Sequence, residues 1–539
     1  MNKPLDWWKG GIIYQIYPRS FYDSNGDGIG DLPGVMAKLE YVASLGVDGI
    51  WLSPFFTSPM KDFGYDVSDY RGVDPMFGSL DDFKRLVSKA HHLNLKVLID
   101  QVISHTSDEH PWFKESSSSR DNSKSDWYVW ADPKPDGTPP NNWLSIFTGS
   151  AWQYHQERQQ YYLHNFLVSQ PDLNFHNEEV RKANLENMRF WLDLGVDGFR
   201  LDTVNFYYHE AELRDNPPIT SLDKKNPALP ATNPYTWQQH IYDLSRPENI
   251  GFISDIRELL DEYPGSTLVG EITDDKPLQR MEEYTQGQDR LHMAYTFDLL
   301  TDRCDTAYIR NVIQQFNTIA PDAWPCWALS NHDVIRSASR WGMAEDAEAY
   351  PLIILVMIMS LRGSVCLYQG EELGLTEAEV PFEKLQDPYG ISYWPEYKGR
   401  DGCRTPMVWN SSSCGGFSEV EPWLPIDVRH LVKSVQEQDN SQESMLNKLR
   451  RFIKWRNQHP VLLKGELQLL KGNDDALCWI RKFGDESVLV AINLTSESIK
   501  VDWAGGLLRV LQGHGLGGKL RDSEIILPAY QGFFAEIIS

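Results

Sequence analysis

The order of apolar and helical segments constrains the fold of this chain more than any other feature. A short apolar run, a polar loop and a helical stretch follow one another from residue 12 to about residue 370. This alternation is typical of βα units around a parallel sheet. Eight runs qualify as strands, the number that closes a TIM-type (β/α)8 barrel. The predicted strands are 12–17, 49–52, 96–99, 198–201, 268–270, 294–297, 327–329 and 365–368.

Helix start and stop signals support the same α/β class. An apolar stripe over 33–46 begins at a proline and ends at a glycine, which predicts one helix. Ser79 and Asp82 have the spacing of a capping box before a second helix. A third long helix is expected from Asn177 to Gly195.

Two segments do not fit the barrel pattern. Between the third and fourth strands lie about 70 residues, far more than the usual βα loop of roughly 4 to 6, so 105–175 is predicted to be an inserted subdomain with an aromatic core of its own. Residues 372–445 are predicted to be irregular, and short alternating runs predict a C-terminal antiparallel β-sandwich over 461–539. The barrel itself is assigned 1–104 and 176–460.

Composition narrows the function classes. The formal net charge of −25 disfavours nucleic acid and anionic membranes as partners, and favours a neutral small molecule. Six scattered cysteines without a CxxC pair suggest free thiols in a reducing compartment. The run 351–361 is too short to cross a bilayer, and no leader-like apolar segment precedes residue 12, so we expect a cytoplasmic protein. We also expect a monomer or homodimer, and no organic cofactor.

Charged residues follow three of the predicted strands, where a barrel carries its reactive groups. Arg200 and Asp202 are two residues apart and face the same side of the fourth strand, so the cation is expected to lower the pKa of Asp202. Glu271 follows an apolar run, and its pKa is expected to be raised. His332 and Asp333 follow the seventh strand. Converging carboxylates of this kind suit cleavage of a glycosidic bond, although a single Asp or Glu is usually only solvated.

These segments resemble the conserved motifs of the α-amylase family of glycoside hydrolases. The four motifs are DQVISH (100–105), GFRLDTV (198–204), VGEI (269–272) and NHD (331–333). QPDLN (170–174), IIYQIYPRSF (12–21), GIWLSPFFTSPMKDFGYDVSDY (49–70) and GRDGCRTPM (399–407) narrow the resemblance to the oligo-1,6-glucosidase and α-glucosidase branch.

The resemblance implies roles for individual residues. It implies that Asp202 is a nucleophile, Glu271 an acid/base and Asp333 a stabiliser of the transition state. The residues that it implies hold the terminal glucose are Asp62, Tyr65, His105, Arg200, His332 and Arg400. Aromatic residues expected to line the pocket walls are Phe147, Phe166, Phe206 and Phe297, although all but Phe166 would fit a core equally well.

Thr203 bears on linkage preference. In this branch the residue after the nucleophile tends to be Thr in enzymes that prefer α-1,4 bonds and Val in those that prefer α-1,6 bonds. Thr203 therefore favours maltose-type substrates, unless the position tolerates either residue. The expected activity is that of a retaining exo-acting α-glucosidase, with transglucosylation as a side reaction.

Four other functions remain open at this point. The chain would also suit an oligo-1,6-glucosidase, or a trehalose synthase or sucrose-acting glucosyltransferase of the same family. The heavy chains of certain amino-acid transporters resemble this barrel too. They have a transmembrane helix and have lost the carboxylates that this sequence keeps.

A structural divalent cation, Ca²⁺ or Mg²⁺, is predicted on the loop after the first strand. Its oxygen ligands alternate, and Gly28 occupies the sharp-turn position, but Gly34 stands where a calcium loop has a bidentate Glu. The predicted ligands are Asp23, Asn25, Asp27, the carbonyl of Ile29, and Asp31. A Gly/Asp turn without an ion is the alternative. Ser104 replaces the Asn that binds interdomain calcium in secreted amylases, so a second calcium there is not expected.

Overall fold

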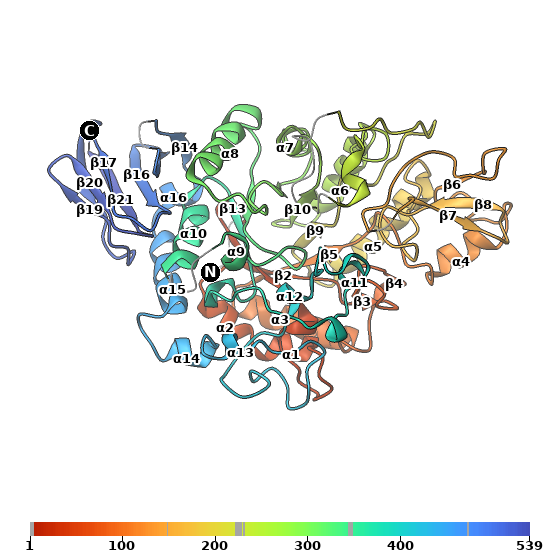
Figure 1. The fold of residues 1–539 in the computed structure, drawn as a ribbon, viewed down its shortest axis with the longest axis horizontal. Coiled ribbons are helices and arrows are strands. Elements are labelled where there is room, and N and C mark those ends of the chain that lie inside the picture. Colours follow the sequence, from red (N-terminus) through yellow and green to blue (C-terminus); the bar gives the residue numbers. More distant parts are fainter. Residues whose placement is uncertain are drawn as a thin grey trace.

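Parallel strands form a barrel at the centre of the molecule (Figure 1). The computed structural model describes residues 5–147, 149–220, 229, 232–342, 349–471 and 474–538. Within them, the barrel sheet has the order β11-β10-β9-β5-β2-β1-β13-β12, which confirms the predicted α/β barrel class. Its strands are β1 (Ile12–Ile16), β2 (Gly49–Leu52), β5 (Lys96–Gln101), β9 (Gly198–Leu201), β10 (Thr267–Ile272), β11 (Met293–Thr296), β12 (Cys326–Ala328) and β13 (Ser364–Tyr368).

The ring closes weakly between β11 and β12. Neighbouring strands elsewhere in the barrel pair over three or four successive residues. In the described residues, β11 and β12 are joined through one isolated parallel bridge, between Ala294 and Pro325. Because proline has no backbone N–H, Pro325 cannot donate a hydrogen bond across this seam.

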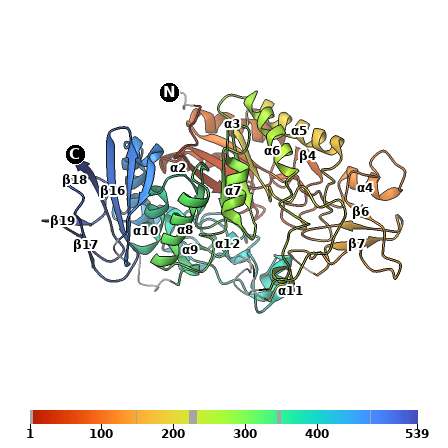
Figure 2. The same cartoon turned by 90° about the horizontal axis from the view of Figure 1, so that it is seen from above.

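Helices surround the barrel (Figures 1 and 2). The capping box predicted for α3 is present, since Ser79 and Asp82 bond each other's backbone N–H. Asn177 caps α5 as expected, and Gly195 follows that helix with φ +94°. The helices are α1 (Leu32–Ala37), α2 (Leu39–Ser44), α3 (Leu80–His92), α5 (Glu178–Asp193), α6 (Asn249–Asp261), α7 (Pro277–Thr285), α8 (Thr306–Ile319), α9 (Ser337–Arg340) and α10 (Ala349–Ser360).

The single helix predicted over 33–46 is wrong, because the chain breaks it into α1 and α2. Lys38 lies between them with φ −107° and ψ 5°, outside the helical range. Its ammonium lies 4.2 Å from the ring centroid of Tyr22 and 4.5 Å from that of Trp409. These cation–π contacts favour the bent backbone, and an apolar stripe does not reveal them.

A subdomain follows β5, at the opposite end of the molecule from the C-terminal sheets (Figures 1 and 2). Its sheet has the order β6-β8-β7, and the rings of Trp143 and Trp152 stack with centroids 5.9 Å apart in a hydrophobic cluster of its own. A short hairpin of β3 and β4 follows β2. These elements are β3 (Phe56–Thr57), β4 (Asp69–Val73), α4 (Pro111–Ser118), β6 (Trp130–Ala131), β7 (Trp152–His155) and β8 (Gln160–Leu163).

The segment 372–445 contains short helices, in contrast to the irregular structure expected from its sequence. Asp387 caps α11 and Asp427 caps α13, so single aspartates start helices of only four to six residues that lack a periodic apolar face. The helices from here to the C-terminal sheets are η4 (Glu371–Leu373), η5 (Phe382–Lys384), α11 (Pro388–Tyr393), α12 (Asp401–Arg404), α13 (Val428–Leu431), α14 (Val435–Asp439), α15 (Met445–Arg456) and α16 (Pro460–Lys464). Two further short helices are η1 (Pro18–Ser20) and η3 (Pro234–Trp237).

Two antiparallel sheets make up the described part of the C-terminal region. Their orders are β14-β15-β16-β21-β18 and β17-β20-β19. Arg481 is buried and donates to the carbonyls of Ser360 and Leu361, which fastens β15 to the end of α10. The strands are β14 (Glu466–Leu469), β15 (Ala476–Phe483), β16 (Glu486–Asn493), β17 (Ile499–Asp502), β18 (Leu507–Val510), β19 (Lys519–Arg521), β20 (Glu524–Leu527) and β21 (Gly532–Ile538).

Two further features of the described residues concern their helices and their cysteines. Across the described ranges, no helix is both long enough and apolar enough to cross a bilayer. All six cysteines are free thiols, and the sulfurs of Cys326 and Cys366 lie 3.3 Å apart on the neighbouring strands β12 and β13.

Candidate active site

A pocket of about 840 Å³, including its open mouth, lies at the carboxyl ends of the barrel strands. Arg200 and Asp202 come from the end of β9, Glu271 from β10, and Asp333 from the segment after β12. Among the residues predicted for the site, those that line the pocket are Asp62, Tyr65, His105, Phe147, Phe166, Asp202, Thr203, Phe206, Glu271, Phe297, Asp333 and Arg400. Arg200 and His332 lie behind this lining and hold it in place through hydrogen bonds.

Four residues form what we call the Arg200 cluster: Arg200, Asp100, Asp202 and Glu271. The guanidinium is 1% exposed, and its Nη1 donates to Asp100 Oδ1 at 2.7 Å and to Asp202 Oδ1 at 2.6 Å. Its Nη2 lies 2.6 Å from Glu271 Oε2. The register of β5 against β9 pairs Asp100 with Arg200. This pairing explains why the motif DQVISH contributes a carboxylate that binds Arg200. The carboxylates of Asp202 and Glu271 are therefore held by adjacent nitrogens of one cation.

Burial, not the cation, decides the protonation of these carboxyls. It raises the pKa of Asp202 to about 7, with Asp100 adding to the rise, although Arg200 acts to lower it. The expectation that Arg200 would leave Asp202 with a low pKa is therefore wrong, since one cation serves three buried carboxylates. Burial also raises the pKa of Glu271 to about 7 and that of Asp100 to about 6, as was expected in direction for Glu271. The cluster thus retains a shared proton near neutral pH.

Two further groups hold Glu271. The hydroxyl of Tyr295 donates to Glu271 Oε1 at 2.9 Å and accepts from Arg200 Nη2 at 2.9 Å. The backbone N–H of Thr203 donates to Glu271 Oε2 at 3.2 Å. Thr203 has φ +41°, a conformation that a β-branched residue seldom adopts without functional reason.

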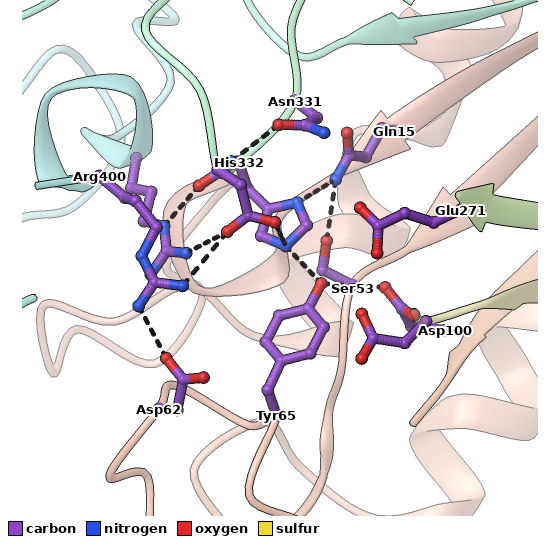
Figure 3. Close-up of polar contacts among 12 residues, drawn as sticks. Gln15, Ser53, Asp62, Tyr65, Asp100, Glu271, Asn331, His332 and Arg400 are labelled. Carbon is purple, nitrogen blue, oxygen red and sulfur yellow. Dashed lines mark hydrogen bonds and ion pairs between the residues drawn. The ribbon is translucent and has the colours of Figure 1, made fainter. Parts of the chain in front are cut away.

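A second group, the Arg400 cluster, consists of Arg400, Arg404, Asp62, Asp333 and Asp387. Arg400 Nη2 donates to Asp62 Oδ1 at 2.8 Å and to Asp387 Oδ1 at 2.7 Å, and its Nη1 lies 3.3 Å from Asp333 Oδ1. Arg404 Nη2 donates to the same Asp333 oxygen at 2.9 Å. In Figure 3, Arg400 faces Asp62 on one side of the site, while Glu271 and Asp100 lie on the other.

Two of the three carboxylates of this cluster, Asp333 and Asp387, have lowered pKa values, in contrast to the Arg200 cluster. Burial acts to raise the pKa of Asp333, but it is held well below its ordinary value by the His332 ring, which is protonated at the acidic pH where Asp333 titrates, and by the guanidiniums of Arg400 and Arg404. Asp387 behaves likewise: burial is opposed by Arg400, and the pKa falls to about 2. For Asp62 burial prevails over Arg400 and Arg404, and its pKa is raised.

Tyr65 and His332 connect the two clusters (Figure 3). The rings of Tyr65 and His332 are stacked, with centroids 5.1 Å apart and planes 4° from parallel. The Tyr65 hydroxyl donates to Asp100 Oδ2 at 3.0 Å and is hydrogen-bonded to His332 Nε2. Gln15 Nε2 lies 2.8 Å from His332 Nδ1, and burial lowers the pKa of His332 to about 3, so the ring is neutral.

Aromatic rings form one wall of the pocket. Phe147 and Phe166 reach it from the inserted subdomain, and their ring centroids are 5.7 Å apart. Phe206 lies 5.6 Å from Phe166, and Tyr389 of α11 lies 5.0 Å from Phe147. Such a wall offers apolar faces of the kind against which sugar rings stack.

Several residues of the site are absent from the sequence-based prediction. The register of β10 against β11 pairs Tyr295 with Glu271. The sequence signal for Tyr295 is its place among the alternate residues of β11 whose side chains face the inside of the barrel. Gln170 lies in QPDLN and donates to Asp62 Oδ2 at 3.1 Å. Asp387 and Arg404 come from the segment 372–445, where no periodic pattern marks them.

The loop predicted to bind a cation lies between η1 and α1. Asp23 accepts from the backbone N–H groups of Asn25, Gly26 and Gly28 and from Ser418 Oγ, which uses the four lone-pair sites of a carboxylate. Asp31 accepts from Ser24 and from Gly34 N–H at the start of α1. In the residues that the structure describes, no three of His, Cys, Asp and Glu come together as metal ligands. Asp27 accepts from the Ile29 N–H and from Asn25 Nδ2, and a cation held by Asp23, Asn25, Asp27, the Ile29 carbonyl and Asp31 stays a prediction.

Comparison with known proteins places this site in a family. A probable alpha-glucosidase of Rhizobium meliloti (strain 1021) is 54% identical over 535 residues, covering 99% of this chain and 97% of that protein. An oligo-1,6-glucosidase of Heyndrickxia coagulans is 37% identical, covering 94% of this chain and 96% of that protein. The crystal structure of an alpha-glucosyl transfer enzyme, XgtA, superposes with a TM-score of 0.97 at 52% identity, covering 99% of each chain.

The family model described as the alpha amylase catalytic domain matches residues 15–465. This range begins in β1 and ends just before β14, so it contains nearly the whole barrel, the inserted subdomain and every residue of the two clusters. The chain therefore belongs to the alpha-amylase family.

Proposed function

We propose that the chain is a retaining exo-acting α-glucosidase that releases α-glucose from short α-glucosides, with a preference for α-1,4 links. One observation carries the proposal: Asp202 and Glu271 bind adjacent nitrogens of Arg200, and burial raises the pKa of both to about 7. A pair that shares one proton near neutral pH has the ionised nucleophile and the protonated acid that retaining glycosidases need. The glucosidase names of similar proteins support the same class.

In the first step, protonated Glu271 donates its proton to the glycosidic oxygen, and the bond from that oxygen to C1 breaks. A carboxylate oxygen of Asp202 forms a bond to C1, giving a β-glucosyl ester, and the aglycone leaves with the proton. Positive charge develops on the ring between these events. Asp333, whose pKa is held well below its ordinary value, supplies a permanent negative charge beside the ring.

In the second step, the Glu271 carboxylate takes a proton from water while the water oxygen attacks C1. The ester bond to Asp202 breaks, which restores the carboxylate and leaves α-glucose. Tyr295 and Thr203 N–H support this exchange because both donate to the ionised form of Glu271. Arg200 balances whichever carboxylate is charged.

The Arg400 cluster suits the hydroxyls of a terminal glucose. Asp62 offers carboxylate acceptors and Arg400 offers N–H donors at one side of the pocket. His105 and Gln170 lie beside Asp62 and add further polar contacts. Recognition of these terminal hydroxyls would limit cleavage to the non-reducing end. Thr203, directly after the nucleophile, supports the α-1,4 preference through the family trend.

The anomer formed first tests the mechanism, and a point variant tests the nucleophile. Proton NMR of maltose hydrolysis should give α-glucose as the initial product, and β-glucose would refute retention. Asp202→Asn should lower kcat at least about a thousandfold, because it removes the covalent step, while leaving the melting temperature within a few degrees. Substantial activity in this variant would refute the assignment.

Glucosyl transfer is the second candidate, favoured by the 52% identity to a protein titled an alpha-glucosyl transfer enzyme. An acceptor hydroxyl would replace water in the second step. Incubation with maltose, isomaltose and sucrose separates the possibilities: free glucose supports hydrolysis, new oligosaccharides support transfer, and trehalose or a sucrose isomer would favour an isomerase. A faster rate with isomaltose than with maltose would favour an oligo-1,6-glucosidase.

The remaining proposals concern the cellular compartment and the oligomeric state of the enzyme. Six free thiols support a reducing, cytoplasmic compartment. A monomer or homodimer acting on neutral oligosaccharides agrees with the charge of −25, and light scattering of the purified protein measures its mass.

A further inference from the structure

Ser104 is the position at which the first motif has Ser in place of Asn, and its hydroxyl joins two residues of the site. The side chain is on the loop after β5 and is 2% exposed. Its Oγ lies 2.9 Å from His105 Nδ1 and 3.1 Å from Thr203 Oγ1. Ser104 therefore connects a predicted glucose-binding histidine to the residue beside the nucleophile.

The neighbours of His105 determine where its proton lies. Nε2 is 2.9 Å from the carbonyl oxygen of Tyr65, which can only accept, so Nε2 carries the hydrogen. Gln170 Nε2 lies 3.2 Å from the same ring nitrogen, and one of its two hydrogens is directed to Asp62 Oδ2 at 3.1 Å; the other cannot be accepted by His105 Nε2, whose hydrogen is donated to the Tyr65 carbonyl. Burial lowers the pKa of His105 to about 4, which leaves a neutral ring with a single N–H. His105 Nδ1 must therefore be an acceptor.

This proton position orients the next two hydroxyls. Ser104 is the donor to His105 Nδ1, since that nitrogen has no hydrogen to give. With its own hydrogen used, Ser104 Oγ can only accept from Thr203, so the Thr203 hydroxyl donates to Ser104. The competing acceptor for the Thr203 hydrogen, Asp202 Oδ2, is farther away at 3.4 Å. The result is a one-way chain from Thr203 through Ser104 and His105 to the Tyr65 carbonyl.

We propose that Ser104 is a positioning residue that orients the Thr203 hydroxyl and so sets the linkage preference of the enzyme. The inference rests on the proposed glucosidase function. With its hydrogen directed to Ser104, Thr203 leaves Asp202 Oδ2 free for attack on C1. Its own oxygen turns lone pairs towards the pocket, where they accept from a sugar hydroxyl. Without Ser104, the Thr203 hydroxyl turns and donates to the nucleophile, which weakens Asp202 and removes that acceptor.

A double-mutant cycle tests the proposal. The measured quantity is the ratio of kcat/KM for maltose to kcat/KM for isomaltose in wild type, Ser104→Ala, Thr203→Val and the double variant. Ser104→Ala should lower this ratio about three- to tenfold, the effect of one buried hydrogen bond. In the Thr203→Val background the same change should alter the ratio less than about twofold, because no hydroxyl remains to be oriented. An unchanged ratio in Ser104→Ala, or an equal shift in both backgrounds, would overturn the proposal.

Two variants guard against a purely structural effect. Ser104→Cys keeps a side chain of similar size but weakens donation and acceptance, so its ratio should fall in the same direction without a cavity. Ser107→Ala removes another buried hydroxyl from the same loop, one that contacts Asp108 rather than Thr203, and should leave the ratio unchanged. A ratio that stays at the wild-type value in Ser104→Cys, or that falls in Ser107→Ala, would contradict the inference.

The wild-type measurement distinguishes failure of the proposed function from failure of this inference. If the wild type hydrolyses neither maltose nor isomaltose, the proposed function fails, and with it the basis of the role of Ser104. If the wild type hydrolyses them but replacing Ser104 leaves the ratio of kcat/KM values unchanged, only the proposed role of Ser104 is wrong.

Discussion

The two charged clusters of the pocket have the same ingredients in different proportions. In the Arg200 cluster, three buried carboxylates share one guanidinium, and the pKa of each rises, to about 6 for Asp100 and about 7 for Asp202 and Glu271. In the Arg400 cluster, three carboxylates share the guanidiniums of Arg400 and Arg404, and the pKa of Asp333 and Asp387 falls. The side chain of Asp333 is 28% exposed, but Asp387 is fully buried and its pKa still falls, so burial alone does not distinguish the clusters.

The difference teaches that the count of cations decides what each cluster can do. With one cation for three carboxylates, the Arg200 cluster keeps a mobile proton, which general acid catalysis requires. With a second cation, the Arg400 cluster keeps Asp333 and Asp387 as fixed charges, although the pKa of Asp62 is raised; such charges suit binding of hydroxyls and stabilisation of a positive transition state. Three substitutions test this contrast and a chelation experiment outside both clusters gives a reference, with expected effects that decrease from the Arg200 cluster outwards.

Removing the cation of the Arg200 cluster should have the largest effect. Arg200→Met leaves three carboxylates without a partner and should cost about 3–5 kcal/mol of unfolding free energy at pH 8, with loss of activity. The raised pKa values mean that the folded state binds protons more readily than the unfolded state, so these groups lower stability as pH rises from the unfolded values near 4 to the folded values of about 6 to 7, above which both states are deprotonated. Urea unfolding should therefore show that Arg200→Met loses less unfolding free energy, relative to the wild type, at pH 5 than at pH 8.

A matched control is Arg456→Met. Arg456 is equally buried but donates to the carbonyls of Met359 and Gly10, so the loss should be similar at both pH values. Equal losses at pH 5 and pH 8 for Arg200→Met would mean that the carboxyls do not carry the shared proton.

Weakening the Arg400 cluster should affect binding and spare chemistry. Asp387 accepts from the backbone N–H, Nε and Nη2 of Arg400 and does not line the pocket itself. Asp387→Asn should raise KM for maltose about tenfold, the scale of a hydrogen bond between charged groups, while kcat stays within about threefold. Steady-state kinetics measures both quantities.

Asp427→Asn serves as its control, because Asp427 caps α13 as Asp387 caps α11, but its side chain is paired with Arg429 instead of Arg400. Its KM should stay near the wild-type value. A fall in kcat at constant KM for Asp387→Asn would place the Arg400 cluster in the chemical step instead.

A smaller effect should follow from removing a donor to Glu271. Because the Tyr295 hydroxyl donates to the ionised carboxylate, it lowers the pKa of Glu271, and Tyr295→Phe should raise it. The alkaline limb of kcat/KM, expected near pH 7 in the wild type, should move up by about half to one pH unit. A shift to lower pH would show that the hydroxyl acts mainly on another group.

The smallest effect should come from the loop between η1 and α1, which lies outside both clusters. If a divalent cation binds Asp23, Asn25, Asp27, Ile29 and Asp31, chelation should lower the melting temperature by a few degrees and leave kcat/KM within about twofold. Elemental analysis after purification without added metal checks the premise. A content of less than one divalent ion per several chains would contradict the predicted cation site.

Residues at the ends of apolar runs could be predicted from sequence, because a barrel brings those ends together. Asp202, Glu271 and Asp333 all follow recognisable strands and line one pocket. The register between strands is not visible in a single sequence, so Tyr295 and Asp100 were missed as partners of Glu271 and Arg200. Helix termini followed local caps closely, except at Lys38, where contacts with Tyr22 and Trp409 override the periodicity.

Charge balance was the least predictable property. Arg200 is two residues from Asp202 in sequence, which suggested a lowered pKa for Asp202, but Asp100 and Glu271 compete for the same guanidinium from other strands. Asp387 and Arg404, which complete the opposite cluster, lie in a segment without a periodic pattern. A pKa depends on every neighbour in space, whereas a sequence window reveals only those along the chain.

The seam between β11 and β12 has a mechanical consequence for catalysis. Glu271 lies on β10 and Asp333 follows β12. These two carboxylates therefore lie on opposite sides of the seam between β11 and β12, where the strand pairing of the barrel is weakest. Local opening favours the part of a structure with the fewest cross-strand hydrogen bonds. Amide exchange in the barrel is therefore expected to be fastest on either side of Pro325. Small changes in the separation of Glu271 and Asp333 can occur at this seam while the other strands keep their pairing.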